Sequence, residues 1–265
     1  MMSDIESEAK TKAEHFRTEH GLGVQPLTNL AVLIEKTTGI GVAVIATADG
    51  SHGLKMRDPL RDRTLIAVAK TPHYMRQRST LAHELGHALF GDSIEILGER
   101  SSKERRADSF ARHLLIPAGG LHALLRKGEE LTLPHLSEVV QHFLVSPQMA
   151  CIALQKNGFI NQETVESWWA LTTEKLANRF GWADQYKALQ AESDQTRVPQ
   201  NLLKRAIDAY SKGLVSAQII ATLRGVDLET ALADLSEIDP NGTFGEGRIK
   251  FSELPDVDID LSELD

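Results

Sequence analysis

The chain has little cysteine and no long apolar stretch, and these absences exclude several classes of protein. Cys151 is the only cysteine among 265 residues, so no disulfide can form within the chain, as is typical of a reducing compartment. No apolar run approaches the roughly 18 residues that a membrane-spanning helix needs. Residues 1–8 lack the basic and apolar regions of a secretory signal peptide. We therefore expect a cytoplasmic protein that does not enter a membrane.

Positive charge is also scarce. The net charge is −8, and residues 236–265 alone hold nine acidic side chains against two basic ones. That segment therefore carries −7, which leaves −1 for residues 1–235. A nearly neutral body with an acidic tail argues against nonspecific DNA binding, which needs a basic surface. In the tail, apolar and acidic residues alternate; it could add an edge strand, but we expect it to be flexible.

The remaining composition is that of an ordinary globular protein, with 42% hydrophobic and 25% charged residues. Helical spacing of apolar residues predicts helices over 4–20 and about 26–36. Three short segments that are candidates for strands follow, at 42–46, 52–56 and 64–69. Turn-rich segments separate them and no helix intervenes, so we expect an antiparallel sheet.

Beyond the sheet the sequence reads as helical. A long helix begins after Pro72 and ends at Gly91, and another spans 102–116. Two short helices at 133–143 and 147–155 look like a helix-turn-helix pair, although a plain helical hairpin packed on the first domain is the favoured interpretation. The aromatic residues of 164–192 are expected to form a small core rather than a partner surface.

The long helix carries the motif His83-Glu84-x-x-His87. On a helix the two histidines lie about 40° apart on one face, one turn above the other, and can bind one zinc ion. Glu84 lies on the flank of that face, where a general base would be placed. Gly86 lies on the same side, where a side chain would crowd a cleft. The rest of the helix surface is apolar, so unpartnered histidines would be costly there, and we predict one zinc ion per chain.

The third zinc ligand should be a carboxylate, because no third histidine follows at the metzincin spacing. Glu104 is the best candidate, and Asp108, one turn later, can accept the free imidazole N–H of a liganding histidine. A competing interpretation is that Ser101-x-x-Glu104 is a capping box, in which Glu104 bonds back to the helix start. Other carboxylates that are near in sequence are Asp92, Glu95 and Glu99.

Residues 76–87 and the Glu-x-x-Ala-Asp run that begins at Glu104 together resemble the ImmA/IrrE family of zinc metallopeptidases. The run is also similar to that of the wider thermolysin-like group. The family commonly has Phe where Ser79 stands and Asn where Asp108 stands, and neither position is a zinc ligand. The resemblance covers about residues 25–160.

This resemblance implies an activity and a partner. It implies site-specific peptide hydrolysis, with zinc on His83, His87 and Glu104 and with Glu84 as the catalytic base. It also implies that the substrate is a helix-turn-helix (XRE-like) transcriptional repressor. Such repressors are cleaved or inactivated in a stress or DNA-damage response, or in the control of mobile elements.

The resulting prediction is an α+β protein with a three-stranded antiparallel sheet and a zincin-like domain, followed by mostly helical regions. The predicted parts are a metallopeptidase domain at 1–126, a helix-turn-helix-like segment at 127–163, a helical region at 164–235 and the acidic tail at 236–265.

Three questions stay open at this level. The donor that stabilises the oxyanion could be any of four residues, which are His52, His73, Tyr74 and Arg76. The zinc could instead be a structural strut, with Cys151 as fourth ligand, in a protein that sequesters a regulator without cleaving it. A DNA-binding role for 133–155 or 216–235 is not expected, because the second helix of the pair at 133–155 has no basic cluster.

Overall fold

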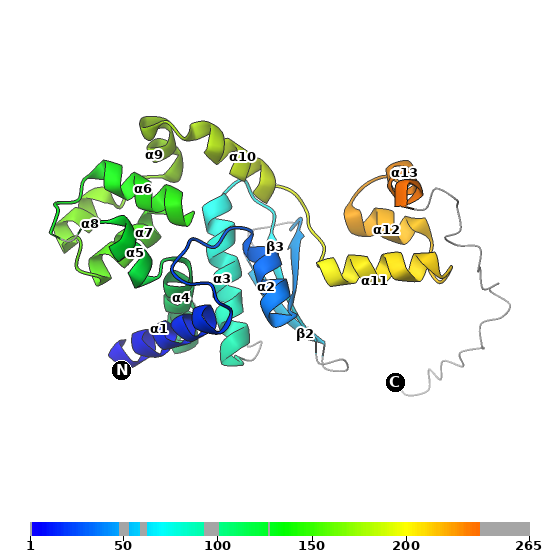
Figure 1. Ribbon diagram of the computed structural model, residues 1–265, viewed down its shortest axis with the longest axis horizontal. Coiled ribbons are helices and arrows are strands. Elements are labelled where there is room, and N and C mark those ends of the chain that lie inside the picture. Colours follow the sequence, from blue (N-terminus) through cyan, green and yellow to red (C-terminus); the bar gives the residue numbers. More distant parts are fainter. Residues whose placement is uncertain (1, 48–52, 59–62, 93–100, 127, 239–265) are drawn as a thin grey trace, which may run out of the picture. The chain divides into compact units, whose positions relative to one another are not determined.

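The computed structural model describes residues 2–47, 53–58, 63–92, 101–126 and 128–238 (Figure 1). The chain forms two compact units, Met1–Arg197 and Val198–Asp265, and each is described by itself. The boundaries predicted at 126, 163 and 235 stay predictions. Three residues considered above, and the tail from 239 onward, lie outside the described residues; the three are His52, Glu95 and Glu99.

The first two helices are α1, Met2–Glu19, and α2, Leu30–Thr38. Helix α1 buries one stripe at helical spacing, made of Ala9, Ala13 and Phe16. Helix α2 begins several residues later than predicted, because the Asn29 side chain caps it by accepting a hydrogen bond from the main-chain N–H of Val32.

The sheet contains β1, Gly41–Ile45, β2, Gly53–Asp58, and β3, Arg63–Ala69, in the order β1-β3-β2. The α+β class is confirmed, and β2 pairs antiparallel with β3 as predicted. The fully antiparallel arrangement is wrong, because β1 runs parallel to β3. A meander would place β2 between its neighbours in sequence, whereas β2 lies at the edge. The continuous apolar run Val42–Val44 is buried, as is typical of a strand paired in parallel.

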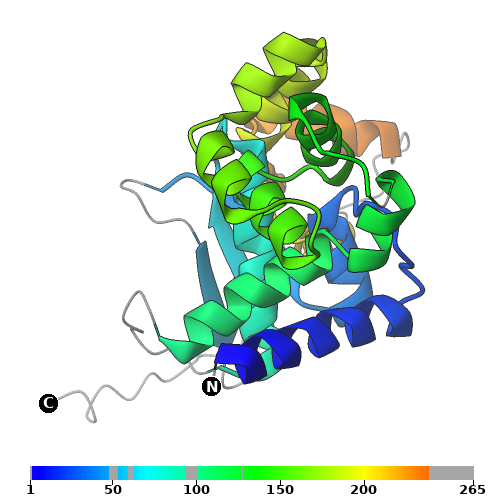
Figure 2. The same cartoon turned by 90° about the vertical axis from the view of Figure 1, so that its left-hand side faces the viewer.

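Helix α3, Tyr74–Phe90, and helix α4, Ser102–Leu115, lie at the centre of the first unit. Helix α4 packs between α1 and α3, as the contacts and Figures 1 and 2 show. A Cβ atom at Gly86 of α3 would lie 3.0 Å from Cδ1 of Phe110 and 3.4 Å from Cα of Ala107. Gly86 therefore lets α3 and α4 approach closely, which differs from the predicted role of keeping a cleft clear.

The helices that follow are α5 (Ala118–Leu124), α6 (Leu133–Phe143), α7 (Pro147–Lys156), α8 (Gln162–Trp168), α9 (Thr173–Phe180) and α10 (Ala183–Ser193). The predicted short pair is thus observed as α6 and α7. One hydrophobic core extends from Ala9 to Tyr186. Trp168 and Trp182 are buried in it, and the indole N–H of Trp182 donates to Ser137 Oγ over 2.9 Å. The aromatic region is therefore mainly core, with Trp169 exposed.

The second unit contains α11, Gln200–Ser211, α12, Ala217–Arg224, and α13, Leu228–Ile238. Its small core is built around Ile220 and Leu235. None of the described helices has the length and apolar character that crossing a bilayer requires.

Candidate metal centre

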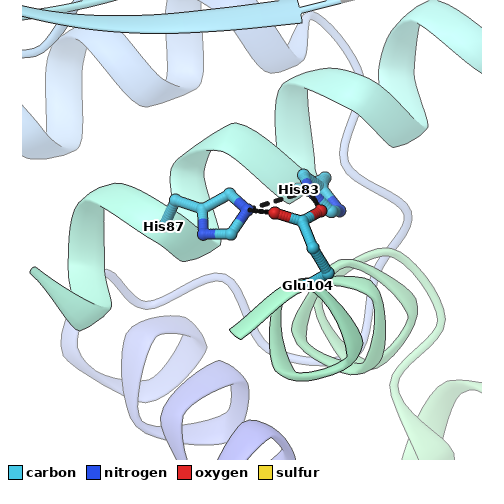
Figure 3. Close-up of side chains that lie close together, drawn as sticks. All are labelled: His83, His87 and Glu104. Atoms are coloured by element: carbon cyan, nitrogen blue, oxygen red, sulfur yellow. Dashed lines mark hydrogen bonds and ion pairs between the residues drawn. The ribbon is translucent and has the colours of Figure 1, made fainter. Parts of the chain in front are cut away.

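The three predicted ligands lie together at the contact between α3 and α4 (Figure 3). The Nε2 atoms of His83 and His87 are 3.0 Å apart. One carboxylate oxygen of Glu104 lies 3.1 Å from Nε2 of His83, and the other lies 3.2 Å from Nε2 of His87. All three groups are largely or partly shielded from solvent, with side chains 10–26% exposed.

The competing capping-box interpretation of Glu104 is half right. Its main-chain N–H donates to Ser101 Oγ over 3.2 Å, so Ser101 does cap α4. The Glu104 carboxylate faces the two imidazoles. The helix start therefore fixes the backbone of Glu104 and leaves its side chain available for a metal.

A second carboxylate orients each histidine. Nδ1 of His83 lies 2.8 Å from Oδ1 of Asp108, which is the predicted contact. Nδ1 of His87 lies 2.8 Å from Oδ2 of Asp92. A carboxylate accepts hydrogen bonds, so the proton of each neutral imidazole is on Nδ1 and the lone pair is on Nε2.

This arrangement fits a divalent metal ion. Two Nε2 lone pairs and one carboxylate converge, and three acceptors at such distances repel one another unless a cation lies among them. Zinc–nitrogen bonds of about 2.0–2.1 Å place tetrahedral ligand atoms about 3.3 Å apart, close to the spacings found here. Burial opposes a charged His83, but the hydrogen bond and charge of Asp108 and the charges of Glu104 and Glu84 raise its pKa. The same negative potential attracts a metal cation.

Asp92 is an alternative ligand on sequence grounds, but its side chain accepts a hydrogen bond from Nδ1 of His87. This is the imidazole nitrogen that does not face Glu104. The chain reverses at Gly91, whose φ of 69° is left-handed, and the N–H of Asp92 then donates to the carbonyl of His87 over 3.0 Å. The position of Asp92, directly after the glycine that ends the helix, is the sequence signal for this contact.

Arg106 of α4 holds Asp92 in place. Its Nη2 lies 2.8 Å from Asp92 Oδ1, and its Nη1 lies 2.9 Å from Glu8 of α1. The guanidinium also lies over the Phe90 ring, 4.1 Å from its centroid. The Asp92 side chain is 5% exposed. A buried carboxylate is costly without partners, and Arg106 and His87 supply them here. The sequence gives no local signal for this role of Arg106, because its contacts come from separate elements.

Other residues singled out from the sequence are elsewhere. Tyr74 lies about 180° around α3 from His83 and is buried beside Arg78, so it does not face the metal centre. His113 of α4 faces Glu6 of α1, 2.9 Å away, and is not part of the metal centre. Cys151 is fully buried in the core, where burial raises its pKa to about 11, and it is not part of the metal centre.

Glu84 is half-buried on α3, directly after His83. Its charge is close enough to contribute to the raised pKa of His83. Its predicted role as a base is chemically compatible with this position.

A mixed sheet packed against a His-Glu-x-x-His helix, with a carboxylate ligand from the next helix, defines a metallopeptidase-type centre. Residues 38–155 match the family model of the IrrE N-terminal-like domain, a peptidase family, and this match supports an ImmA/IrrE-type metallopeptidase domain in this part of the chain. The match includes both histidines, Glu84, Glu104 and Asp108, and it ends within α7. No curated protein matches the chain.

Proposed function

We propose that this protein is a zinc-dependent endopeptidase. The observation that carries the proposal is the convergence of the Nε2 atoms of His83 and His87 and the Glu104 carboxylate at 3.0–3.2 Å. The cluster found among the described residues has three members, which is the number that catalytic zinc sites use. A bound zinc ion polarises the scissile carbonyl and lowers the pKa of water at the site.

The side chains have distinct roles in this proposal. His83, His87 and Glu104 hold the metal, while Asp108 and Asp92 keep the two imidazoles in the correct tautomer. Glu84 accepts a proton from the attacking water and delivers it to the leaving amine.

The proposed substrate is a helix-turn-helix (XRE-like) repressor, cleaved in a stress response or in the control of mobile elements. The match to the IrrE N-terminal-like domain supports this proposal. The ImmA/IrrE family, which residues 76–87 and the run from Glu104 resemble, typically acts with such repressors. The proposed location is the cytoplasm, where such a repressor acts.

The test uses the repressor encoded nearest the gene as substrate. Wild-type protein loaded with zinc should cleave the repressor at a single site. A chelator should abolish this cleavage. Glu84→Gln should retain one zinc per chain, measured by elemental analysis, and lose cleavage by about a hundredfold or more. Glu163→Gln, an exposed change on α8, is the matched control and should cleave normally.

Two results would contradict the proposal. Full cleavage by Glu84→Gln would remove the general base from the mechanism. A wild-type protein that binds zinc and inhibits the repressor without any cut would favour the alternative, a zinc-containing protein that sequesters a regulator.

A further inference from the structure

A cavity of about 640 Å³ lies beside the first two turns of α3. Four elements surround it: the start of α3, the start of α7, the segment that joins α8 to α9, and α10. Its volume is within the range of about 300–1,000 Å³ that is usual for ligand pockets. No residue of the metal centre lines it, so it is a separate feature that needs its own explanation.

The cavity adjoins the face of α3 that carries the two histidines of the candidate metal centre. Arg76 and Ser79, which line it, precede His83 by seven and four residues. At 100° per residue these three positions lie on one stripe of the helix, and Ser79 is about 6 Å from His83 along the axis. An extended peptide advances about 3.3 Å per residue, so a chain held at the metal reaches the cavity within about two residues.

The buried part of the lining is mainly apolar, although Thr173 is also buried there. Met75, Pro147 and Tyr186 are buried, and Met149 and Leu171 are partly exposed into the cavity. Two methionines make such a wall adaptable in shape. The charged residues of the lining, which are exposed, have both signs: Arg76 and Glu174. Neither charge sign is therefore favoured, and the cavity suits an uncharged, apolar group.

The wall opposite α3 is held in place by hydrogen bonds. The side-chain amide of Gln148 donates to the carbonyls of Trp169 and Leu171, over 2.8 and 2.9 Å. The Gln77 amide donates to the carbonyls of Ala69 and Ser193 over 3.0 and 2.9 Å, which ties the end of α10 to the sheet and α3. The cavity is therefore formed before any ligand arrives.

We propose that this cavity is a specificity pocket, which takes a large apolar side chain of the polypeptide substrate within two residues of the scissile bond. The inference rests on the proposed peptidase function. Residues 171–190 form one side of the pocket and lie outside the segment that matches the peptidase family. The choice of cleavage sequence thus depends on helices that the family domain does not contain.

The test measures binding, so that it does not depend on cleavage. The probes are three peptides with an N-terminal metal-binding hydroxamate followed by Leu-Ala, Ala-Leu or Ala-Ala. Zinc-loaded protein should bind one of the leucine probes at least about tenfold more tightly than the Ala-Ala probe in calorimetry, because the leucine buries its side chain.

The decisive variant is Ser79→Phe, which fills the cavity from α3 and introduces the residue that ImmA/IrrE proteins commonly have at this position. The preference for leucine should fall below about threefold, while affinity for the Ala-Ala probe and for zinc stays within about twofold. Ser167→Phe, the same change at an exposed site on α8, should keep the full preference. The second variant, Leu171→Ala, should also lower the affinity of the protein for the preferred leucine probe.

The outcomes separate the two proposals. Equal binding of all three probes by the wild-type protein would overturn the pocket, and so would a leucine preference that survives Ser79→Phe. Either result would leave repressor cleavage intact. A protein that prefers a leucine probe but cuts no repressor would instead overturn the proposed function.

Discussion

Nδ1 of His87 lies 2.8 Å from Oδ2 of Asp92, a residue beyond the end of the helix that carries the histidine. Asp92 is in turn bound by Arg106 of α4, and Arg106 is bound by Glu8 of α1. The orientation of this histidine therefore depends on three separate elements. Helix α1, which lies outside the family match, is one of them.

Replacement of Asp92 should weaken zinc binding. Asp92→Ala removes the acceptor that fixes the His87 tautomer and leaves the Arg106 charge without its buried partner. We expect a loss of about 10- to 100-fold in zinc affinity, measured by competition with a chromophoric chelator. Asp92→Asn should lose less, because an amide oxygen still accepts from Nδ1.

The control for this series is Asp184→Ala on α10, where the carboxylate is fully exposed. It should leave zinc affinity unchanged. Unaltered affinity in Asp92→Ala would show that the contact does not position His87.

Addition of a methyl group at Gly86 should push α3 away from α4. The new Cβ would lie 3.0 Å from a ring atom of Phe110 and 3.4 Å from the backbone of Ala107. Because α4 carries Glu104, the metal centre should widen as well. We expect Gly86→Ala to lower the free energy of unfolding by about 1–3 kcal/mol, measured by urea denaturation, and to weaken zinc binding. Normal stability together with normal zinc affinity would contradict the close-packing role.

The three candidate ligands could be identified from the sequence because they belong to local patterns. Helical periodicity places His83 and His87 on one face, and a single run supplies Glu104 and Asp108. The contact between the two runs, and the link from Asp92 to Arg106, depend on how α3 packs on α4. No local pattern specifies that packing.

The sheet shows the same limit. The first and third strands were recognisable from runs that contain β-branched residues, and the second was a weaker candidate between two turn-rich segments, but their order was not recognisable. The choice between a meander and an edge position for β2 depends on what covers each face, which is a property of the whole fold. The burial of three successive residues in β1 is the one local hint of the parallel pairing.

Zinc should stabilise the fold without being required for it. The main core extends through residues far from the metal centre, so the apo protein should keep its far-UV circular dichroism spectrum. A zinc concentration of about 100 times Kd should add about 2.7 kcal/mol of stability, seen as a rise in Tm. His87→Ala should abolish that rise, and an equal rise in this variant would place the stabilising zinc elsewhere.

The last prediction concerns acid stability and Glu6 of α1. Its carboxylate accepts hydrogen bonds from Ser109, Arg112 and His113 of α4, and Lys156 of α7 lies 3.5 Å away. Burial tends to raise the pKa of Glu6, but the hydrogen bonds and the charge of Arg112 lower it from 4.5 to about 2. A carboxylate with a depressed pKa stabilises the folded state fully above its unfolded pKa. The gain is lost as the pH falls from about 4.5 toward 2.

Glu6→Gln should therefore lower the free energy of unfolding at pH 7. The shift alone corresponds to about 3 kcal/mol, and screening at a partly exposed group reduces this to about 1–2 kcal/mol. The difference from wild type, measured by urea denaturation at several pH values, should shrink below pH 4.5 and vanish near pH 2. Glu14→Gln on the exposed side of α1 should show no such difference, because its partner Lys10 is 3.8 Å away in solvent. A difference in the free energy of unfolding between Glu6→Gln and wild type that stays constant across this pH range would contradict the prediction. It would mean that the packing of the Glu6 side chain, and not its charge, stabilises the contact between α1 and α4.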